Sequence, residues 1–229
     1  MLPPRPGDAL GRASVSAAVE RVSSKRHRTT LSGENRVLNG PSQSRAYCPS
    51  CGQTVDAYSV EKEGAVEVRC SLCAFPIGVV TGESLQGLSC IMITDDDRFF
   101  RTLLADLLKE RGLAQKVVPC ESGAEFLALA AERISQNLPT KLAILDIVMA
   151  HLDGVATALA LRAFERGLKT AQPIPILFLS AVPPDDTLKS IISQHQPALY
   201  LNKGSDASPE KLLPRLEQVI AYLIQRESR

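Results

Sequence analysis

The stretch CIMITDDDRFFRTLLADLLKERG, residues 90–112, decides the fold of most of the chain. A short apolar run, residues 90–94, ends in three adjacent carboxylates, and an amphipathic segment follows at once and closes at Gly112. The run has the length and composition of a buried strand, and the segment has the period of a helix. We therefore predict a strand, an acidic loop and a helix in direct succession.

The same alternation continues toward the C-terminus. Four more apolar runs predict strands, and each is followed by a segment with helical periodicity. The apolar runs are residues 116–119, 142–146, 174–180 and 198–202. The helical segments that follow them are residues 122–136, a segment that begins at about residue 153, residues 185–194, and a last segment that ends near residue 226. Five strands alternating with five helices predict an α/β fold, a five-stranded parallel doubly wound sheet with helices on both faces.

Polar side chains stand where the predicted strands end. Asp95 and Asp96 follow the first strand, Asp146 ends the third, Ser180 ends the fourth, and Lys203 follows the fifth. Parallel sheets of this kind bind ligands at the carboxyl ends of their strands. Three carboxylates in one crevice need a cation, and oxygen ligands suit Mg²⁺. The hydroxyl and the ammonium group can then hold the oxygens of a transferred phosphoryl group.

The stretches IMITDDD, LAILDIVMAHLDG, ILFLSA and ALYLNKG together resemble the receiver domain of two-component response regulators, over residues 88 to about 226. The resemblance implies a flavodoxin-like fold and a phosphoacceptor at Asp146, which a histidine kinase or a phosphotransfer protein phosphorylates. It also implies that Val148 adds a backbone carbonyl to the Mg²⁺ ligands, that Ala181 lies beside the phosphoryl group, and that Tyr200 is the switch aromatic. A receiver assists its own phosphorylation and dephosphorylation only, so we do not expect an enzyme.

Two positions depart from the receiver pattern. Ala150 follows Met149 where the family usually has proline, and Gly204 follows Lys203 where the family usually has a cis proline. A cis bond before a residue other than proline costs roughly 2.5–4 kcal/mol, so we expect this loop to run trans or to flex. A degenerate receiver, which signals without phosphate, is therefore an alternative.

Four of the six cysteines form two C-x-x-C pairs, Cys48 with Cys51 and Cys70 with Cys73. The stretches TVDAYSVE and AVEVRC between them predict the two strands of a hairpin. Two thiolate pairs complete a tetrahedral Zn²⁺ site, and Gly52 permits the tight turn that follows the first pair. This part resembles zinc ribbons. Redox cysteine pairs are the alternative, which the lack of a βαβ pattern around them disfavours.

We predict the following division of the chain: a disordered basic tail at residues 1–45, a zinc ribbon at 46–83, a linker at 84–88 and the receiver domain at 89–229. The tail is rich in Pro, Ser, Gly and Arg and has too few apolar residues to offset the entropy of folding. Lys and Arg outnumber Asp and Glu in the tail, whereas acids outnumber bases in the ribbon.

We interpret the chain as a cytoplasmic response regulator that signals through protein contacts to a downstream partner. The resemblance implies that its signalling face comprises the last two helices and the last strand, which a partner, a second copy or the ribbon itself can occupy. A nucleic-acid-binding transcriptional regulator, using ribbon and tail, is the alternative, and the acidic ribbon disfavours it. No apolar run approaches the roughly 20 residues needed to span a bilayer, so we expect no membrane insertion. A haloacid-dehalogenase-type phosphatase needs a second carboxylate two residues after the nucleophile, where this chain has Val148.

Overall fold

The computed structural model describes residues 36–37, 44–62, 65–78, 87–181, 183–204 and 208–227. The chain divides into two units, Met1–Glu34 and Asn35–Arg229, and all described residues belong to the second. Most of the predicted basic tail therefore lies outside the described residues.

Five parallel strands form one sheet, as the sequence predicts. They are β6 (Ile91–Thr94), β7 (Val117–Cys120), β8 (Leu142–Asp146), β9 (Ile176–Ser180) and β10 (Ala198–Asn202), in the order β10-β9-β8-β6-β7. Every neighbouring pair is parallel, and β10 is an edge strand. Because chain order and spatial order change direction between β6 and β8, their carboxyl ends frame the crevice where such sheets bind ligands.

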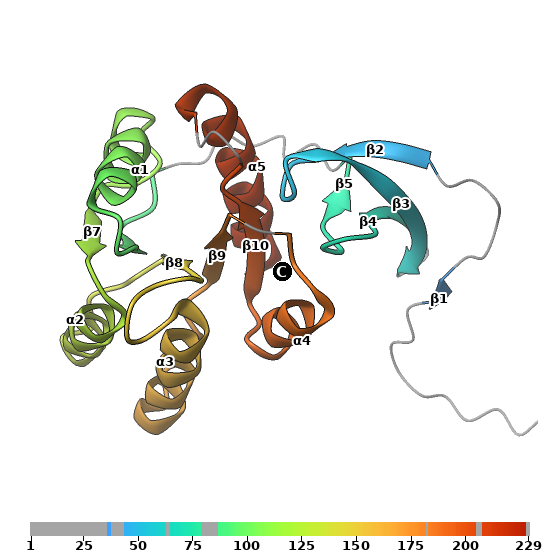
Figure 1. Ribbon diagram of the computed structural model, residues 1–229. Coiled ribbons are helices and arrows are strands. Elements are labelled where there is room, and N and C mark those ends of the chain that lie inside the picture. The colour runs from blue at the N-terminus through green and yellow to red at the C-terminus, as the bar shows by residue number, and fades with distance from the viewer. Residues whose placement is uncertain are drawn as a thin grey trace, which may run out of the picture. The chain divides into compact units, whose positions relative to one another are not determined.

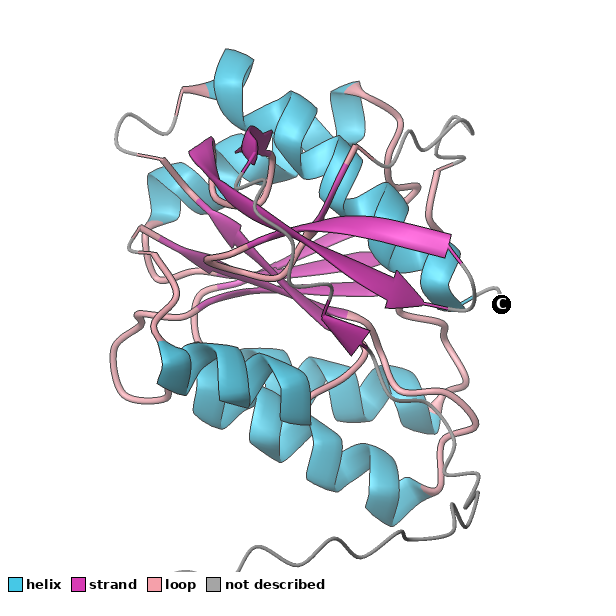
Figure 2. Ribbon diagram, turned by 90° about the vertical axis from the view of Figure 1, so that its right-hand side faces the viewer, coloured by secondary structure: helices cyan, strands magenta, loops and turns pink. Residues whose placement is uncertain are grey.

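Five helices cover this sheet in two layers. They are α1 (Arg98–Glu110), α2 (Gly123–Ser135), α3 (Gly154–Leu168), α4 (Asp186–Gln194) and α5 (Pro209–Glu227). Helices α1 and α5 lie on one face, and α2, α3 and α4 lie on the other (Figures 1 and 2). No helix among the described residues is long and apolar enough to cross a lipid bilayer.

Each face of the sheet has its own apolar core. Alternate residues of the strands point to opposite faces, so Ile93 packs with α1 and α5, and its neighbour Met92 packs with α2 and α3. All four side chains of β6 and all five of β8 and β9 are buried, which explains their continuous apolar runs.

Carboxylates and hydroxyls fix where the helices begin. Asp97 caps α1 by accepting from the backbone N–H groups of Phe99 and Phe100, and Asp153 caps α3 in the same way. Ser122 caps α2, as its spacing from Glu125 predicts. A proline within a helix pattern predicts a delayed or kinked start, but α5 already begins at Pro209 and includes Pro214.

A second sheet, which is antiparallel and also has five strands, precedes the parallel sheet. It contains β1 (Arg36–Val37), β2 (Ser44–Cys48), β3 (Gln53–Lys62), β4 (Ala65–Cys70) and β5 (Pro76–Ile77). The hairpin of β3 and β4 is confirmed. The short strands β1, β2 and β5 were not predicted; β1 and the start of β2 fall within the residues assigned to the tail.

The antiparallel sheet shares a core with α5. Cys48, Val55, Cys70 and Phe75 belong to the same buried cluster as the leucines of α5. The ring of Phe75 meets that of Tyr222 edge to face, with centroids 5.2 Å apart. The antiparallel sheet with its four cysteines therefore packs directly on α5 (Figure 1).

Candidate functional site

The structure brings three carboxylates together at the carboxyl ends of β6 and β8. Asp95 is the first residue after β6, Asp96 follows it, and Asp146 is the last residue of β8. One carboxylate oxygen from each lies within 4.8 Å of the others. Asp95 and Asp146 are buried, and Asp96 is exposed, so the cluster has one side open to ligands.

Lys203 holds the two buried carboxylates. It follows β10, and its Nζ lies 2.8 Å from Asp95 Oδ2 and 2.9 Å from Asp146 Oδ2. The ammonium group also stands 4.4 Å from the centroid of the Phe100 ring, a favourable distance for a cation over an aromatic face. The backbone N–H of Lys203 donates to the Ser180 carbonyl at 2.7 Å, which ties this loop to the end of β9.

Burial and charge act in opposite directions on these groups. Burial raises the pKa of the Asp146 carboxyl, and the hydrogen bond from Lys203 offsets only part of this shift. Burial alone would lower the pKa of Lys203, but hydrogen bonds to Asp95 and Asp146 outweigh it and raise the pKa. The lysine is therefore a fixed positive charge between two acids at neutral pH.

Asp96 connects the acidic cluster to the loop after β8. Its Oδ2 accepts the backbone N–H of Ala150 at 2.9 Å, a contact that the sequence did not predict. Val148 lies in the same loop with an exposed side chain, and its backbone hydrogen-bonds to the Asp146 carboxylate. Ala150 therefore donates the bond that links the loop to Asp96, at the position where the receiver pattern has a proline without an N–H.

The remaining predicted residues flank the cluster on β9 and β10. Ser180 is buried at the end of β9, and Ala181 follows it at the surface. Tyr200 is buried, its hydroxyl accepts Asn202 Nδ2 at 2.8 Å, and burial raises its pKa to about 12. Gly204 has a φ of +87°, a conformation that suits glycine, and among the described residues only the bond before Pro197 is cis.

The donor set of this site fits Mg²⁺. Carboxylate oxygens from three residues, with one side open, match the preference of Mg²⁺ for a few protein oxygens and several waters. Lys203 binds Oδ2 of Asp95 and Oδ2 of Asp146, so an ion would be held by the remaining oxygens of these two residues and by Asp96.

A second cluster is formed by the sulfur atoms of Cys48, Cys51, Cys70 and Cys73. All four lie within 4.8 Å of one another, with Cys48 Sγ 3.6 Å from Cys73 Sγ and Cys51 Sγ 3.8 Å from Cys70 Sγ. These separations exclude disulfides, whose sulfurs lie about 2.05 Å apart. Four sulfurs placed tetrahedrally at about 2.3 Å from Zn²⁺ would be separated by roughly 3.8 Å, so the cluster fits this metal.

Backbone N–H groups support both cysteine pairs in the same way. Cys48 Sγ accepts the N–H of Cys51 at 3.4 Å, and Cys70 Sγ accepts the N–H groups of Leu72 and Cys73 at 3.3 and 3.4 Å. Hydrogen bonds from Cys48 and Cys51 lower the pKa of Cys70 below its ordinary range. Gly52 closes the first turn with a φ of +73°, as predicted.

Sequence reasoning missed the residues that join the two clusters. Ser50, between the first pair of cysteines, bonds to β10, and Arg215 of α5 donates to the carbonyl groups of Pro49, Ser50 and Asn202. A charged residue on the apolar side of α5, between Leu212 and Leu216, was the signal that could have indicated Arg215.

Residues 91–216 match the family model described as response regulator receiver domain. The receiver domain of the histidine kinase CKI1 from Arabidopsis thaliana, complexed with Mg²⁺, is 23% identical with a TM-score of 0.50, covering 61% of this chain and 96% of that chain. The chemotaxis protein CheY4 of Vibrio cholerae is 21% identical with a TM-score of 0.44, covering 58% and 99%. A CheY-like receiver from Methanospirillum hungatei is 22% identical with a TM-score of 0.43, covering 59% and 96%. At these identities the likeness to solved structures concerns the fold.

Proposed function

The chain belongs to the response regulator receiver domain family, and from this premise we propose that Asp146 accepts a phosphoryl group from a histidine kinase or a phosphotransfer protein. The observation that carries the proposal is the bridge of Lys203 between Asp95 and Asp146, with Asp96 beside them. An ammonium group fixed beside a buried carboxylate offsets part of the negative charge of an incoming phosphoryl group.

The transfer forms one bond and breaks another. An oxygen of Asp146 attacks the phosphorus of a phosphohistidine or an acyl phosphate, and the bond from phosphorus to the donor's nitrogen or oxygen breaks as the donor leaves with the electron pair. Lys203 and the Ser180 hydroxyl hold the phosphoryl oxygens. Mg²⁺, when bound by Asp95, Asp96, Asp146 and the Val148 carbonyl, supplies positive charge that lowers the repulsion between the reacting anions.

Acetyl phosphate tests this proposal directly. The full chain would be incubated with Mg²⁺ and acetyl phosphate, and its intact mass would be followed by mass spectrometry. We expect a phosphoryl adduct on the wild type and none on Asp146→Asn, whereas Asp153→Asn, which keeps a side-chain oxygen for capping α3, forms the adduct. No adduct on the wild type would contradict the proposal and favour a receiver that signals without phosphate.

We further propose that residues 46–83 are a zinc ribbon in which Cys48, Cys51, Cys70 and Cys73 bind one Zn²⁺, with residues 84–88 as the linker and 89–229 as the receiver domain. The sulfur separations and the matched N–H···S bonds support this assignment. The antiparallel sheet buries few large apolar side chains, so the metal would supply much of the free energy that folds it.

Metal analysis of the purified chain tests the zinc proposal. We expect about one zinc per chain in the wild type, none in Cys70→Ser, and an unchanged content in Cys90→Ser, because Cys90 lies in the other core. Zinc bound equally by Cys70→Ser would contradict the assignment.

We propose a cytoplasmic signalling role for the phosphorylated chain. The described cysteines are all free, which suits a reducing compartment. Output would pass through contacts with a downstream protein, because phosphorylation changes the charge at the end of β8, beside Lys203, and can shift the neighbouring surface between two states.

A further inference from the structure

The first cysteine knuckle, residues 48–51, lies on the outer edge of β10. Ser50 Oγ donates to the Tyr200 carbonyl, and the Ser50 carbonyl accepts the backbone N–H of Asn202 at 2.8 Å. Both contacts use backbone groups of β10, which is an edge strand. The knuckle therefore pairs with the strand that leads directly to Lys203.

Arg215 joins the knuckle to the same strand from the side of α5. Its Nε lies 2.7 Å from the Pro49 carbonyl oxygen, and its Nη2 lies 3.1 Å from that of Ser50 and 2.7 Å from that of Asn202. The residue is only 7% exposed, so this charge rests on three carbonyl groups away from bulk water. A buried cation loses much of its hydration and needs these acceptors.

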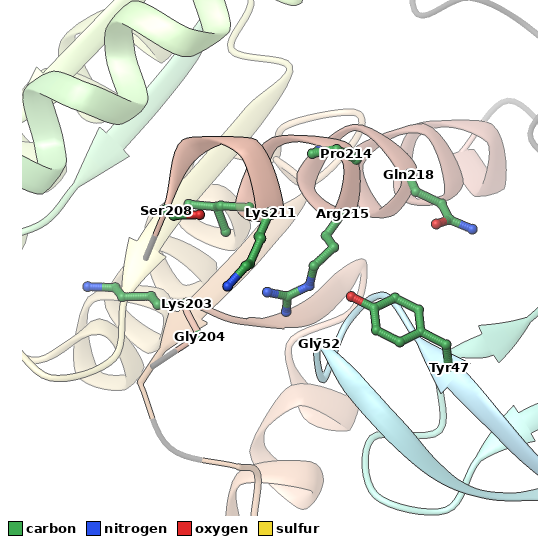
Figure 3. Close-up of a pocket in the computed structure, with 10 residues that line it drawn as sticks. Tyr47, Gly52, Lys203, Gly204, Ser208, Lys211, Pro214, Arg215 and Gln218 are labelled. Carbon is green, nitrogen blue, oxygen red and sulfur yellow. The ribbon is translucent and has the colours of Figure 1, made fainter. Parts of the chain in front are cut away.

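The knuckle and the guanidinium group are in close contact. A Cβ atom at Gly52 would lie 2.6 Å from Arg215 Cζ, so only glycine allows this approach. Figure 3 shows Arg215 reaching from α5 toward Gly52, while the Lys203 side chain points the other way. A cavity of about 540 Å³, whose lining includes Lys203 and Arg215, lies beside this contact.

Asn202 carries the connection to the loop that holds Lys203. Its side chain donates to the Tyr200 hydroxyl at 2.8 Å and accepts the N–H of Gly204 at 2.8 Å. Lys203 itself is tied to Ser180 through its backbone. The backbone on both sides of Lys203 is therefore fixed by a network that begins at the first cysteine pair.

We propose that the first cysteine knuckle, acting through Ser50 and Arg215, positions Lys203, so that metal occupancy of the four-cysteine cluster sets the rate of Asp146 phosphorylation. The inference rests on the proposed function and adds its regulation. Cys48 and Cys51 bracket Pro49 and Ser50, which supply two of the three carbonyl groups that Arg215 binds, so these two acceptors stay in place only while both sulfurs are held. If zinc also changes the equilibrium constant for phosphorylation of Asp146, thermodynamic linkage requires that phosphorylation change the affinity for zinc by the same factor.

The test compares initial rates of phosphorylation by acetyl phosphate in the full chain at fixed Mg²⁺. Zinc-loaded protein is compared with protein treated with a nitrogen-donor chelator such as TPEN, which removes zinc and leaves Mg²⁺. A misplacement of about 1 Å can cost on the order of a hundredfold in rate, so we expect a drop of roughly tenfold to a hundredfold without zinc. Arg215→Gln should show a similar drop with zinc present, Ser50→Ala a smaller one, and Arg215→Lys a partial recovery.

Arg133→Gln is the matched control for a purely structural effect. Arg133 is 9% exposed and also bonds to neutral acceptors, the Pro139 carbonyl and the Thr140 hydroxyl. This site lies before β8, at the opposite end of the sheet. We expect Arg133→Gln to lower thermal stability while leaving the rate unchanged. Mg²⁺ affinity, measured by calorimetry, should rise in Arg215→Gln and stay the same in Arg133→Gln, because a displaced Lys203 no longer neutralises Asp95 and Asp146.

The outcomes separate this inference from the proposed function. If zinc removal and Arg215→Gln leave the rate unchanged while Asp146→Asn abolishes the adduct, positioning by the knuckle is wrong and the phosphoacceptor assignment stands. An equal loss of rate in Arg133→Gln would also overturn it, because a general loss of stability would explain both variants. If the wild type forms no adduct with or without zinc, the proposed function fails and the inference fails with it.

Discussion

Three adjacent aspartates in this protein have three different surroundings. Asp95 is fully buried and bound by Lys203, Asp96 is exposed and accepts the N–H of Ala150, and Asp97 caps α1. Their mutual repulsion is tolerated because each faces a separate positive charge or backbone donor. A residue's position in the run, and not the run itself, decides its role.

This difference predicts opposite effects of two neighbouring substitutions. Asp96→Asn keeps an oxygen for Ala150 but loses the charge proposed to bind Mg²⁺, so Mg²⁺-dependent phosphorylation should disappear with little loss of stability. Asp97→Ala should remain phosphorylated and lose about 1 kcal/mol of unfolding free energy, because a helix cap is removed. Mass spectrometry with acetyl phosphate and urea unfolding would measure the two effects. Full phosphorylation of Asp96→Asn would contradict the role of Asp96.

Two glycines of α3 offer a matched pair of substitutions. A Cβ at Gly154 would lie 2.1 Å from the Asp146 carbonyl oxygen, whereas a Cβ at Gly167 would meet nothing within 4 Å. Gly154→Ala must push the helix away from β8, so we expect a loss of roughly 1–3 kcal/mol and slower phosphorylation. Gly167→Ala should gain roughly 0.5–1 kcal/mol and leave the rate unchanged. Chemical unfolding measures both, and equal stability of the two variants would show that α3 can shift freely.

The acidic residues of the site could be predicted because a parallel sheet brings its strand ends together whatever the intervening sequence. The site could be assigned to Asp95, Asp146 and Lys203 because each lies at the end of an apolar run. Arg215 could not be assigned in the same way, since its partners Pro49 and Ser50 lie more than 150 residues earlier and are backbone carbonyls, which any sequence provides. The contact of Asp96 with Ala150 was missed for the same reason.

At the level of elements, predictions succeeded where a period or a cap was visible. The apolar runs located β6, β8, β9 and β10 to within a residue or two, and the predicted starts of α2 and α3, near residues 122 and 153, lie within a residue of the observed starts. The strand β2 was missed because its sequence SRAYC has little alternation and it pairs with β3 instead of burying its own face. The strand β5 has two residues, too few to show a pattern.

The six cysteines should fall into two classes of reactivity. Burial raises the pKa of Cys120 to about 12 and also raises the pKa of Cys90, so at pH 8 both stay as protonated, inaccessible thiols in the folded chain. We expect DTNB to react slowly with all six thiols when zinc is bound, and rapidly with the four clustered thiols once TPEN has removed it. Peptide mapping of alkylated protein identifies them. Fast modification of Cys120 without unfolding would contradict the burial of α2 against β7.

Over the whole molecule, the phosphoacceptor should lower stability at neutral pH. The pKa of Asp146 is raised above its ordinary value of 3.8, so the folded state binds this proton more tightly than the unfolded chain does. The stability that this carboxyl contributes is present below about pH 3.8 and is lost as pH rises through the folded pKa. Asp146→Asn should therefore have the higher melting temperature at pH 7 without Mg²⁺, and the difference should shrink as the pH falls toward 3.8.

Mg²⁺ provides the control for this pH dependence. Its binding would neutralise the buried acids, so adding Mg²⁺ should raise the melting temperature of the wild type more than that of Asp146→Asn. A difference between the two proteins that stays constant from pH 7 to pH 4 would show that packing, and not ionisation, separates them.

The placement of the cysteine knuckle on β10 has a consequence for solubility. An unpaired edge strand is a template on which other chains can assemble, and folded proteins cover or interrupt such edges. Here the carbonyl of Tyr200 and the N–H of Asn202 are occupied by the loop 48–51, which carries two of the four clustered sulfurs. If the proposed metal were withdrawn and the loop released, these backbone groups would be free to pair with a second copy. Loss of the proposed zinc would then favour aggregation through the edge of β10.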